Sequence, residues 1–166
     1  MIKIKRPAAP LALLLACAAV TLSIPARATE PTTRPAAEAA AQKMLPKAHD
    51  ELWSKLVRCD VKYDEKAGTY GISLTPEVKA LDGQVVTVKG FVLPMDGSDR
   101  TRHFLISRNT PVCLYCPPGE PNEVIEVTAP GGVEWSEKLT TVRGKLHLVN
   151  DEEKALFFRI ENAEAK

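Results

Sequence analysis

Apolar residues follow two different periods along this chain, and the change of period predicts where helix gives way to strand. Between residues 42 and 57 they recur at steps of three and four, which is typical of one buried helix face: Met44, Leu45, Ala48, Leu52, Trp53, Leu56 and Val57. Pro46 stands near the start of this stretch, where proline is tolerated. We therefore expect a helix over residues 46–57, with Trp53 as its core anchor.

A short helix and a series of strands are expected to follow. Thr75, Pro76 and Glu77 form a helix start, and Gly83 ends the turn, so a helix over residues 76–81 is predicted. Beyond it, β-branched and aromatic residues at alternating positions predict five strands, over residues 85–93, 103–107, 124–128, 140–148 and 157–160. Asp60, Asp64 and Glu65 are interpreted as solvated loop charges.

Two of these strands carry a glycine in their middle. Gly90 interrupts the first strand, and Gly144 interrupts the fourth, where Arg143, Lys145 and His147 alternate with apolar neighbours. A mid-strand glycine often marks a bulge or a bend of a curled sheet. The expected fold class is therefore mainly β with one or two short helices, arranged as a small five-stranded OB-like Greek-key barrel.

The first 28 residues have the three-part pattern of a secretory signal peptide. A basic start at Lys3, Lys5 and Arg6 precedes an apolar stretch over residues 11–22, and small residues end at Ala28. We expect cleavage after Ala28 and a periplasmic protein without a transmembrane span in the mature chain. Lipid anchoring at Cys17, which ends a lipoprotein-like Leu-Leu-Ala-Cys run, is the alternative.

The rest of the chain is expected to be a tether followed by one domain. Residues 29–45 are assigned to a flexible tether, since the stretch up to residue 41 is rich in Ala, Thr, Pro and Glu. Residues 46–166 are assigned to a single β-barrel domain. Of the 22 Lys and Arg and 21 Asp and Glu residues, the signal peptide holds four basic and no acidic ones, which leaves 18 against 21. This balance does not favour a nucleic-acid partner.

The candidate chemistry lies in a proline-rich loop with two thiols. Cys113 and Cys116 are three positions apart, and Pro117 and Pro118 follow them. Removal of the signal peptide leaves Cys59 as the third cysteine, an odd number in a compartment where thiols oxidise. The pair could form a disulfide or bind a soft metal such as Zn or Cu.

Three readings of this loop stay open. A metal site would need further ligands, for which Cys59, His103 and His147 are the candidates. A thiol-disulfide oxidoreductase is an alternative, although the prolines exclude the helix start that activates such thiols. A structural disulfide in an interaction module is the third reading.

No catalytic set is recognised in the sequence, so an enzyme is the less favoured class. We find no nucleophile motif, zinc-protease motif or phosphate loop. Loops at one rim of a barrel, over residues 94–102 and 109–122, could instead present Tyr115 and the thiols to a partner.

Several segments resemble a family of small secreted bacterial proteins catalogued as a domain of unknown function. The likeness lies in residues 81–94, 103–107 and 142–146, in Cys113 with two later prolines, and in Pro121-Asn122. The resemblance implies a periplasmic, barrel-like protein, often encoded beside ABC-type envelope transporters and metal-uptake components. Family members usually have one cysteine at the place of Cys113 and a histidine at the place of Leu114 or Tyr115, so Cys116 is a departure.

These observations together predict a function. We expect a non-enzymatic periplasmic accessory or binding protein, linked to metal homeostasis or to an envelope transporter.

Overall fold

The structure, a computed structural model, describes residues 36–98, 100–112 and 118–166. They fall within one compact unit of the chain, Thr33–Lys166. The predicted signal peptide therefore lies outside the described residues. Among the described residues, no helix is both long and apolar enough to cross a membrane.

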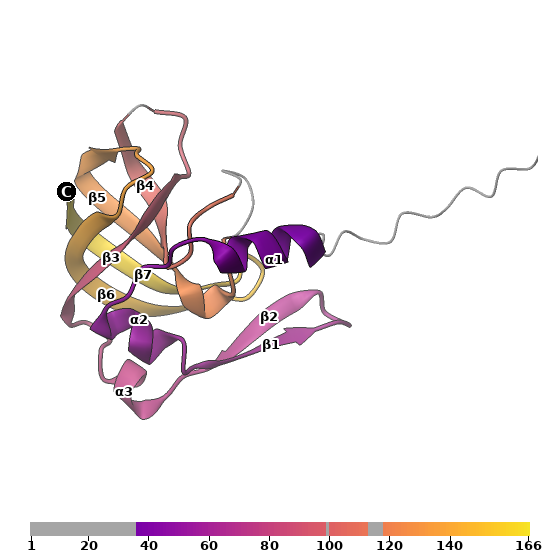
Figure 1. The fold of residues 1–166 in the computed structure, drawn as a ribbon. Coiled ribbons are helices and arrows are strands. Elements are labelled where there is room, and N and C mark those ends of the chain that lie inside the picture. Colours follow the sequence, from indigo (N-terminus) through magenta and orange to yellow (C-terminus); the bar gives the residue numbers. More distant parts are fainter. Residues whose placement is uncertain (1–35, 99, 113–117) are drawn as a thin grey trace, which may run out of the picture. The chain divides into compact units, whose positions relative to one another are not determined.

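The described residues are mainly β, as the periodicity predicts, and include three short α-helices; Figure 1 shows how these elements are arranged. In chain order the elements are α1 (Ala36–Met44), α2 (Glu51–Leu56), β1 (Asp60–Asp64), β2 (Thr69–Ser73), α3 (Pro76–Lys79), β3 (Val85–Pro94), β4 (Arg100–Ser107), a 3₁₀ turn η1 (Pro121–Glu123), β5 (Val124–Glu134), β6 (Thr140–Asp151) and β7 (Leu156–Ala165). All five predicted strands are present as β3 to β7, and each is longer than expected.

Strands β3 to β7 close into a barrel in the order β3-β4-β5-β7-β6. All neighbours are antiparallel except β5 and β7, which pair in parallel at Glu126–Arg159 and Val127–Ile160. Strand β3 changes partner along its length, pairing with β6 up to Gly90 and with β4 from Phe91. This change of partner closes the sheet.

Both mid-strand glycines lie where strands come too close for a side chain. A Cβ at Gly90 would stand 2.6 Å from the carbonyl oxygen of Ser107, and one at Gly144 would stand 2.6 Å from Cγ2 of Ile160. Gly144 also sits in a register shift between Arg143 and Lys145. The sequence interpretation of these glycines as marks of a strongly curved sheet is consistent with this packing.

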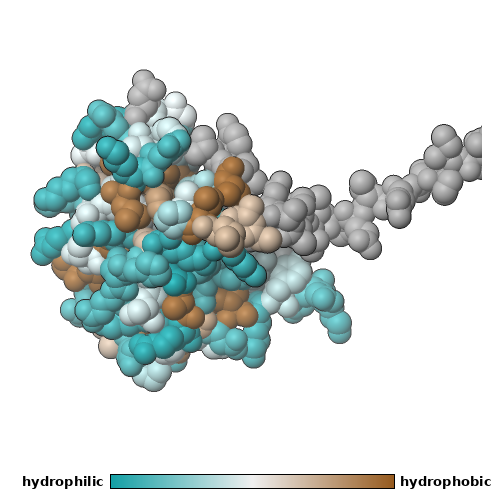
Figure 2. Space-filling model, in the orientation of Figure 1, coloured by the Kyte–Doolittle hydropathy of each residue, from teal (hydrophilic) through white to brown (hydrophobic). Residues whose placement is uncertain are grey.

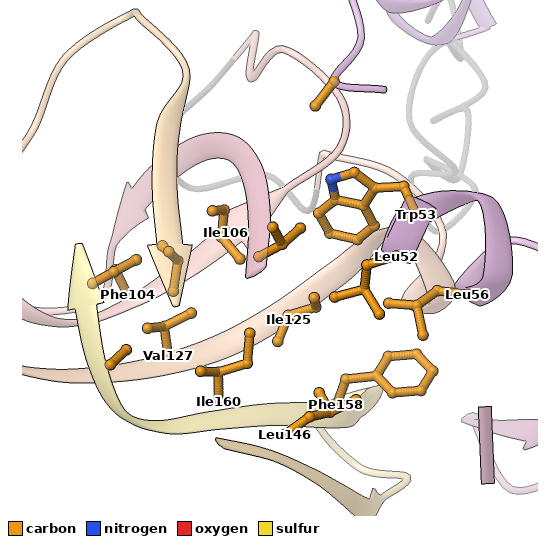
Figure 3. Packing of buried hydrophobic residues seen from close by; sticks show 14 of the residues in the cluster. Leu52, Trp53, Leu56, Phe104, Ile106, Ile125, Val127, Leu146, Phe158 and Ile160 are labelled. Carbon is orange, nitrogen blue, oxygen red and sulfur yellow. The ribbon is translucent and has the colours of Figure 1, made fainter. Parts of the chain in front are cut away.

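The core fills the barrel and continues under α2 (Figure 3). Leu52, Trp53 and Leu56 of α2 are at most 6% exposed and belong to the same cluster as Ile125 and Phe158 of the barrel. The indole N–H of Trp53 donates to the carbonyl oxygen of Lys89 at 2.7 Å. Trp53 is thus the predicted core anchor, and it binds α2 to β3.

The helix around Trp53 begins later than the sequence predicts. Asp50 accepts the N–H of Trp53 at 3.0 Å and that of Lys89 at 2.8 Å, which makes it the N-cap. Residues before it are held in extended contacts, because Lys47 bridges Asn109 and the N–H of Ala48 donates to the carbonyl oxygen of Arg108 at 2.7 Å. These tertiary contacts replace the expected helix start at Pro46.

Two elements were not expected from the sequence. Helix α1 occupies Ala36–Met44, where a flexible tether was assigned; its alanines favour helix, and Gln42 is buried. The hairpin β1–β2 occupies Asp60–Ser73. Asp60 and Asp64, interpreted as loop charges, are exposed as expected but belong to strand β1. Most side chains of the hairpin are exposed or half-buried, so it lacks the strong apolar alternation of the barrel strands. Helix α3, in contrast, begins as predicted, with Thr75 as its N-cap.

Candidate functional site

The two ends of the dithiol loop are described, and its centre is not. Cys113, Tyr115 and Cys116 lie outside the described residues, so the structure does not test their predicted roles. The chain is described up to Val112 and again from Pro118. The candidate site is therefore built from the residues at the base of this loop.

A single side chain of α1 bridges the two ends of the loop. The amide nitrogen Nε2 of Gln42 donates to the carbonyl oxygen of Pro118 at 2.7 Å and to that of Thr110 at 3.3 Å. Gln42 is 7% exposed. The hydroxyl of Thr110 also donates to the carbonyl oxygen of Pro46 at 2.6 Å. The role of Gln42 is not predicted from the sequence, because residues 29–45 have the composition of a tether.

The second end of the loop is held by Glu123. Its carboxylate accepts from Arg108 Nη1 at 2.7 Å and from Asn109 Nδ2 at 2.8 Å. Gly119 packs so closely against this pair that a Cβ there would stand 2.6 Å from Glu123 Oε2. Asn122, buried in η1, donates to the carbonyl oxygen of Cys59 at 2.9 Å. The described ends of the loop are thus joined by a network of hydrogen bonds, in which the buried atoms Arg108 Nε and Asn109 Oδ1 have no partner among the described residues.

An apolar groove opens beside this loop base. Its volume is about 500 Å³, within the usual range of ligand pockets. It is lined by Pro46, Phe91, Val92, Thr110, Pro111, Val112, Trp135, Ser136 and Glu137. Trp135 is 46% exposed and Val112 44%, whereas Phe91 at the base is 7% exposed. The groove joins the loop base to β3 and to the connection between β5 and β6.

Figure 2 shows one face of the molecule as mostly hydrophilic, with a few separate hydrophobic patches. Trp135 is not among the residues predicted to bind a partner. A large aromatic residue between two strands is nevertheless a signal for a binding surface that can be recognised in the sequence.

The three further ligand candidates lie in different surroundings. Cys59 is a free thiol, 3% exposed, in the core cluster. His103 of β4 lies on the outer face of the barrel, where its Nε2 contacts Glu126 Oε1 at 2.8 Å. His147 of β6 lies 3.9 Å from both Asp82 and Glu161.

Glu126 and Arg159 separate the two histidines. Arg159 Nε donates to Glu126 Oε2 at 2.7 Å, and Arg159 stands opposite His147 in the β6–β7 register. His103 and His147 thus lie at the two sides of a polar stripe, His103–Glu126–Arg159–His147, that crosses four strands. Because three strand spacings separate the two imidazoles, they lie too far apart to bind the same metal ion. In the described part of the chain, no group of three or more His, Cys, Asp or Glu side chains could hold a metal ion.

Glu126 is ionised within this stripe. Its side chain is 11% exposed, and this burial favours the neutral acid. The hydrogen bonds from His103 and Arg159 favour the carboxylate more strongly, so the pKa of Glu126 lies below its usual value.

The fold and the site define a small mainly β protein with an apolar surface groove beside a loop whose two ends, Thr110 and Pro118, are joined by hydrogen bonds to Gln42. The chain belongs to the family described as protein of unknown function (DUF3299), whose model matches residues 25–159. The resemblance to a family of unknown function is therefore confirmed. A search of curated proteins finds none that matches.

One solved structure is similar to this chain. It is the crystal structure of a DUF3299 family protein from Pseudomonas aeruginosa PAO1 at 2.45 Å resolution, with 22% sequence identity and a TM-score of 0.49. The match covers 58% of this chain and 66% of that chain, slightly less than two thirds of its length.

Proposed function

We propose that this protein is a non-enzymatic binding protein of the periplasm, whose groove receives an apolar group of an envelope protein partner. One observation carries the proposal: Trp135 and Val112 are each nearly half exposed and line the same groove. Large apolar side chains gathered around a concave surface are typical of recognition sites. Periplasmic location is supported by the signal pattern of residues 1–28.

The dithiol loop belongs to the same proposal. Cys113 follows Val112 directly in the chain, and Val112 lines the groove. We propose that Cys113 and Cys116 form a disulfide or bind a soft metal next to the bound partner. Support comes from their spacing and from the hydrogen bonds that hold Thr110 and Pro118. An envelope transporter is the proposed class of partner.

The barrel is proposed to be of the OB type. The support is its strand order β3-β4-β5-β7-β6, with the β5–β7 pair parallel. Barrels of this type use surface strands and rim loops for binding, as this proposal requires.

The groove is tested with an uncharged fluorescent probe, N-phenylnaphthylamine, added to the mature protein. We expect binding in the wild type, loss of most of it in Trp135→Ala, and its retention in Trp135→Phe. Leu139→Ala is the matched control, because Leu139 is 49% exposed and outside the groove. Equal binding by wild type and Trp135→Ala would contradict the proposed groove.

The partner is tested in cells by placing a photo-reactive amino acid at Trp135 and, as a control, at Met44, which is 87% exposed on α1. The proposal expects cross-linking to an envelope protein from position 135 and not from position 44. The same product from both positions argues against a specific groove.

A further inference from the structure

Met95 and His103 are direct neighbours on the outer face of the barrel. The N–H of Met95, the residue after β3, donates to the carbonyl oxygen of His103 at 3.1 Å. This bond extends the β3–β4 register, in which Pro94 stands opposite Phe104. Residues in such a pair have Cα atoms about 5.5 Å apart and side chains on the same face.

Both side chains of this pair are open to solvent. Phe104 is fully buried, so the alternation of the strand turns His103 outward. The side chain of His103 is 44% exposed, and Met95 is 46% exposed. The long, flexible methionine side chain can reach across the pair.

Glu126 orients the imidazole of His103. Oε1 of Glu126 lies 2.8 Å from Nε2 of His103, so the carboxylate occupies that ring nitrogen. Nδ1 is then the ring nitrogen left to bind a metal ion. A carboxylate behind one ring nitrogen is the arrangement that usually supports a metal-binding histidine. Arg159 holds Glu126 in place from the other side.

The ligand chemistry of this pair favours a soft ion. A thioether together with an imidazole suits Cu⁺, whereas hard cations prefer oxygen. Zinc takes four ligands in structural sites, and the described residues offer no His, Cys, Asp and Glu group of that kind. The nearby Arg159 also favours an ion of low charge.

We propose that Met95 and His103 bind one Cu⁺ ion on the outer face of the barrel, with Glu126 as the positioning residue. Met95 and His103 are not among the residues that line the apolar groove. A negative result for this metal site therefore does not contradict the proposed function, and a negative result for the groove does not contradict this metal site.

The test uses the mature chain with Cys113→Ser and Cys116→Ser, which removes competing thiols and keeps the buried Cys59. Ag⁺, a diamagnetic ion that resembles Cu⁺ and is not oxidised in air, is added during NMR of histidine nitrogens and methionine methyl groups. We expect the signals of His103 Nδ1 and the Met95 methyl group to shift together and to saturate at one equivalent. The signals of His49, His147 and Met44 should not follow them. Absence of a shift, or equal shifts at the control residues, would overturn the proposal.

Variants of the same protein test each donor by competition for Cu⁺ with bicinchoninate under nitrogen. Met95→Leu keeps the size of the side chain and should abolish binding, whereas Met44→Leu should not change it. Glu126→Gln should weaken binding about 10- to 100-fold, as removal of an outer partner usually does. An unchanged affinity of Met95→Leu for Cu⁺ would refute the site. Because Met95 is exposed, this variant tests the site even if His103→Gln fails to fold.

Discussion

Glu126 is a nearly buried, charged residue that connects three strands of the barrel. Glu126 belongs to β5. Its carboxylate contacts His103 of β4 and Arg159 of β7, and so it connects the two strands on either side of β5. A buried carboxylate is costly unless its oxygens are satisfied, and here both have a partner. The polar stripe therefore stabilises the parallel β5–β7 contact, which has only two register pairs.

Glu126→Gln is expected to lower the free energy of unfolding by about 1–3 kcal/mol at pH 7, because one amide cannot accept from both neighbours. The pKa of Glu126 is lowered in the folded state, so its contribution is present above the ordinary value of 4.5 and is lost as the pH falls through the folded value. Urea unfolding of wild type and variant at pH 7 and pH 3 measures this. The difference in the free energy of unfolding between wild type and Glu126→Gln should be smaller at pH 3 than at pH 7.

Glu134→Gln is the control for this prediction. Glu134 is 79% exposed and pairs with Arg100 at 3.4 Å, so its loss should cost no more than about 1 kcal/mol. If Glu126→Gln lowers the free energy of unfolding by the same amount at pH 7 and at pH 3, the negative charge of Glu126 does not have the stabilising role assigned to it.

At the scale of elements, α1 determines how the dithiol loop is anchored. This helix has nine residues, which is too short for stability by itself in water. Its contact with the domain includes the Gln42 amide, which meets the carbonyl oxygens of Thr110 and Pro118. The loop ends and α1 therefore support each other.

Gln42→Ala is expected to destabilise α1 and the loop base, because the buried carbonyl of Pro118 loses a donor. We expect a loss of about 1–3 kcal/mol in the free energy of unfolding. Hydrogen exchange at the amides of α1 should also become faster. Lys43→Ala, at an exposed position of the same helix, serves as the control. Protection of α1 that is equal in the two variants would show that Gln42 does not anchor the helix.

At the scale of the whole molecule, one core connects the barrel to α2. Cys59 belongs to this core, in the same cluster as Trp53 and Phe158. A thiol that is 3% exposed there reacts only when the domain opens. The rate at which the Cys59 thiol reacts with a reagent therefore reports on the global stability of the fold.

In the Cys113→Ser/Cys116→Ser mature chain, Cys59 should be unreactive toward a thiol reagent under native conditions. Its labelling rate should rise in parallel with the unfolding measured by Trp fluorescence as urea is added. The unmodified mature chain, fully unfolded and reduced, provides the count of all three thiols. Fast labelling of Cys59 in native buffer would mean that the α2 end of the core opens separately.

The sequence by itself determined the mainly β class, all five barrel strands and the burial of Trp53, because these follow from local periodicity and residue type. It also located the two glycines, since a missing side chain in a strand is a local signal. The tertiary structure alone decided that α2 begins at Glu51, that Gln42 joins the loop ends and that Met95 stands opposite His103. Each of these depends on contacts between residues distant in sequence, and strand register and packing create such contacts only once the chain has folded.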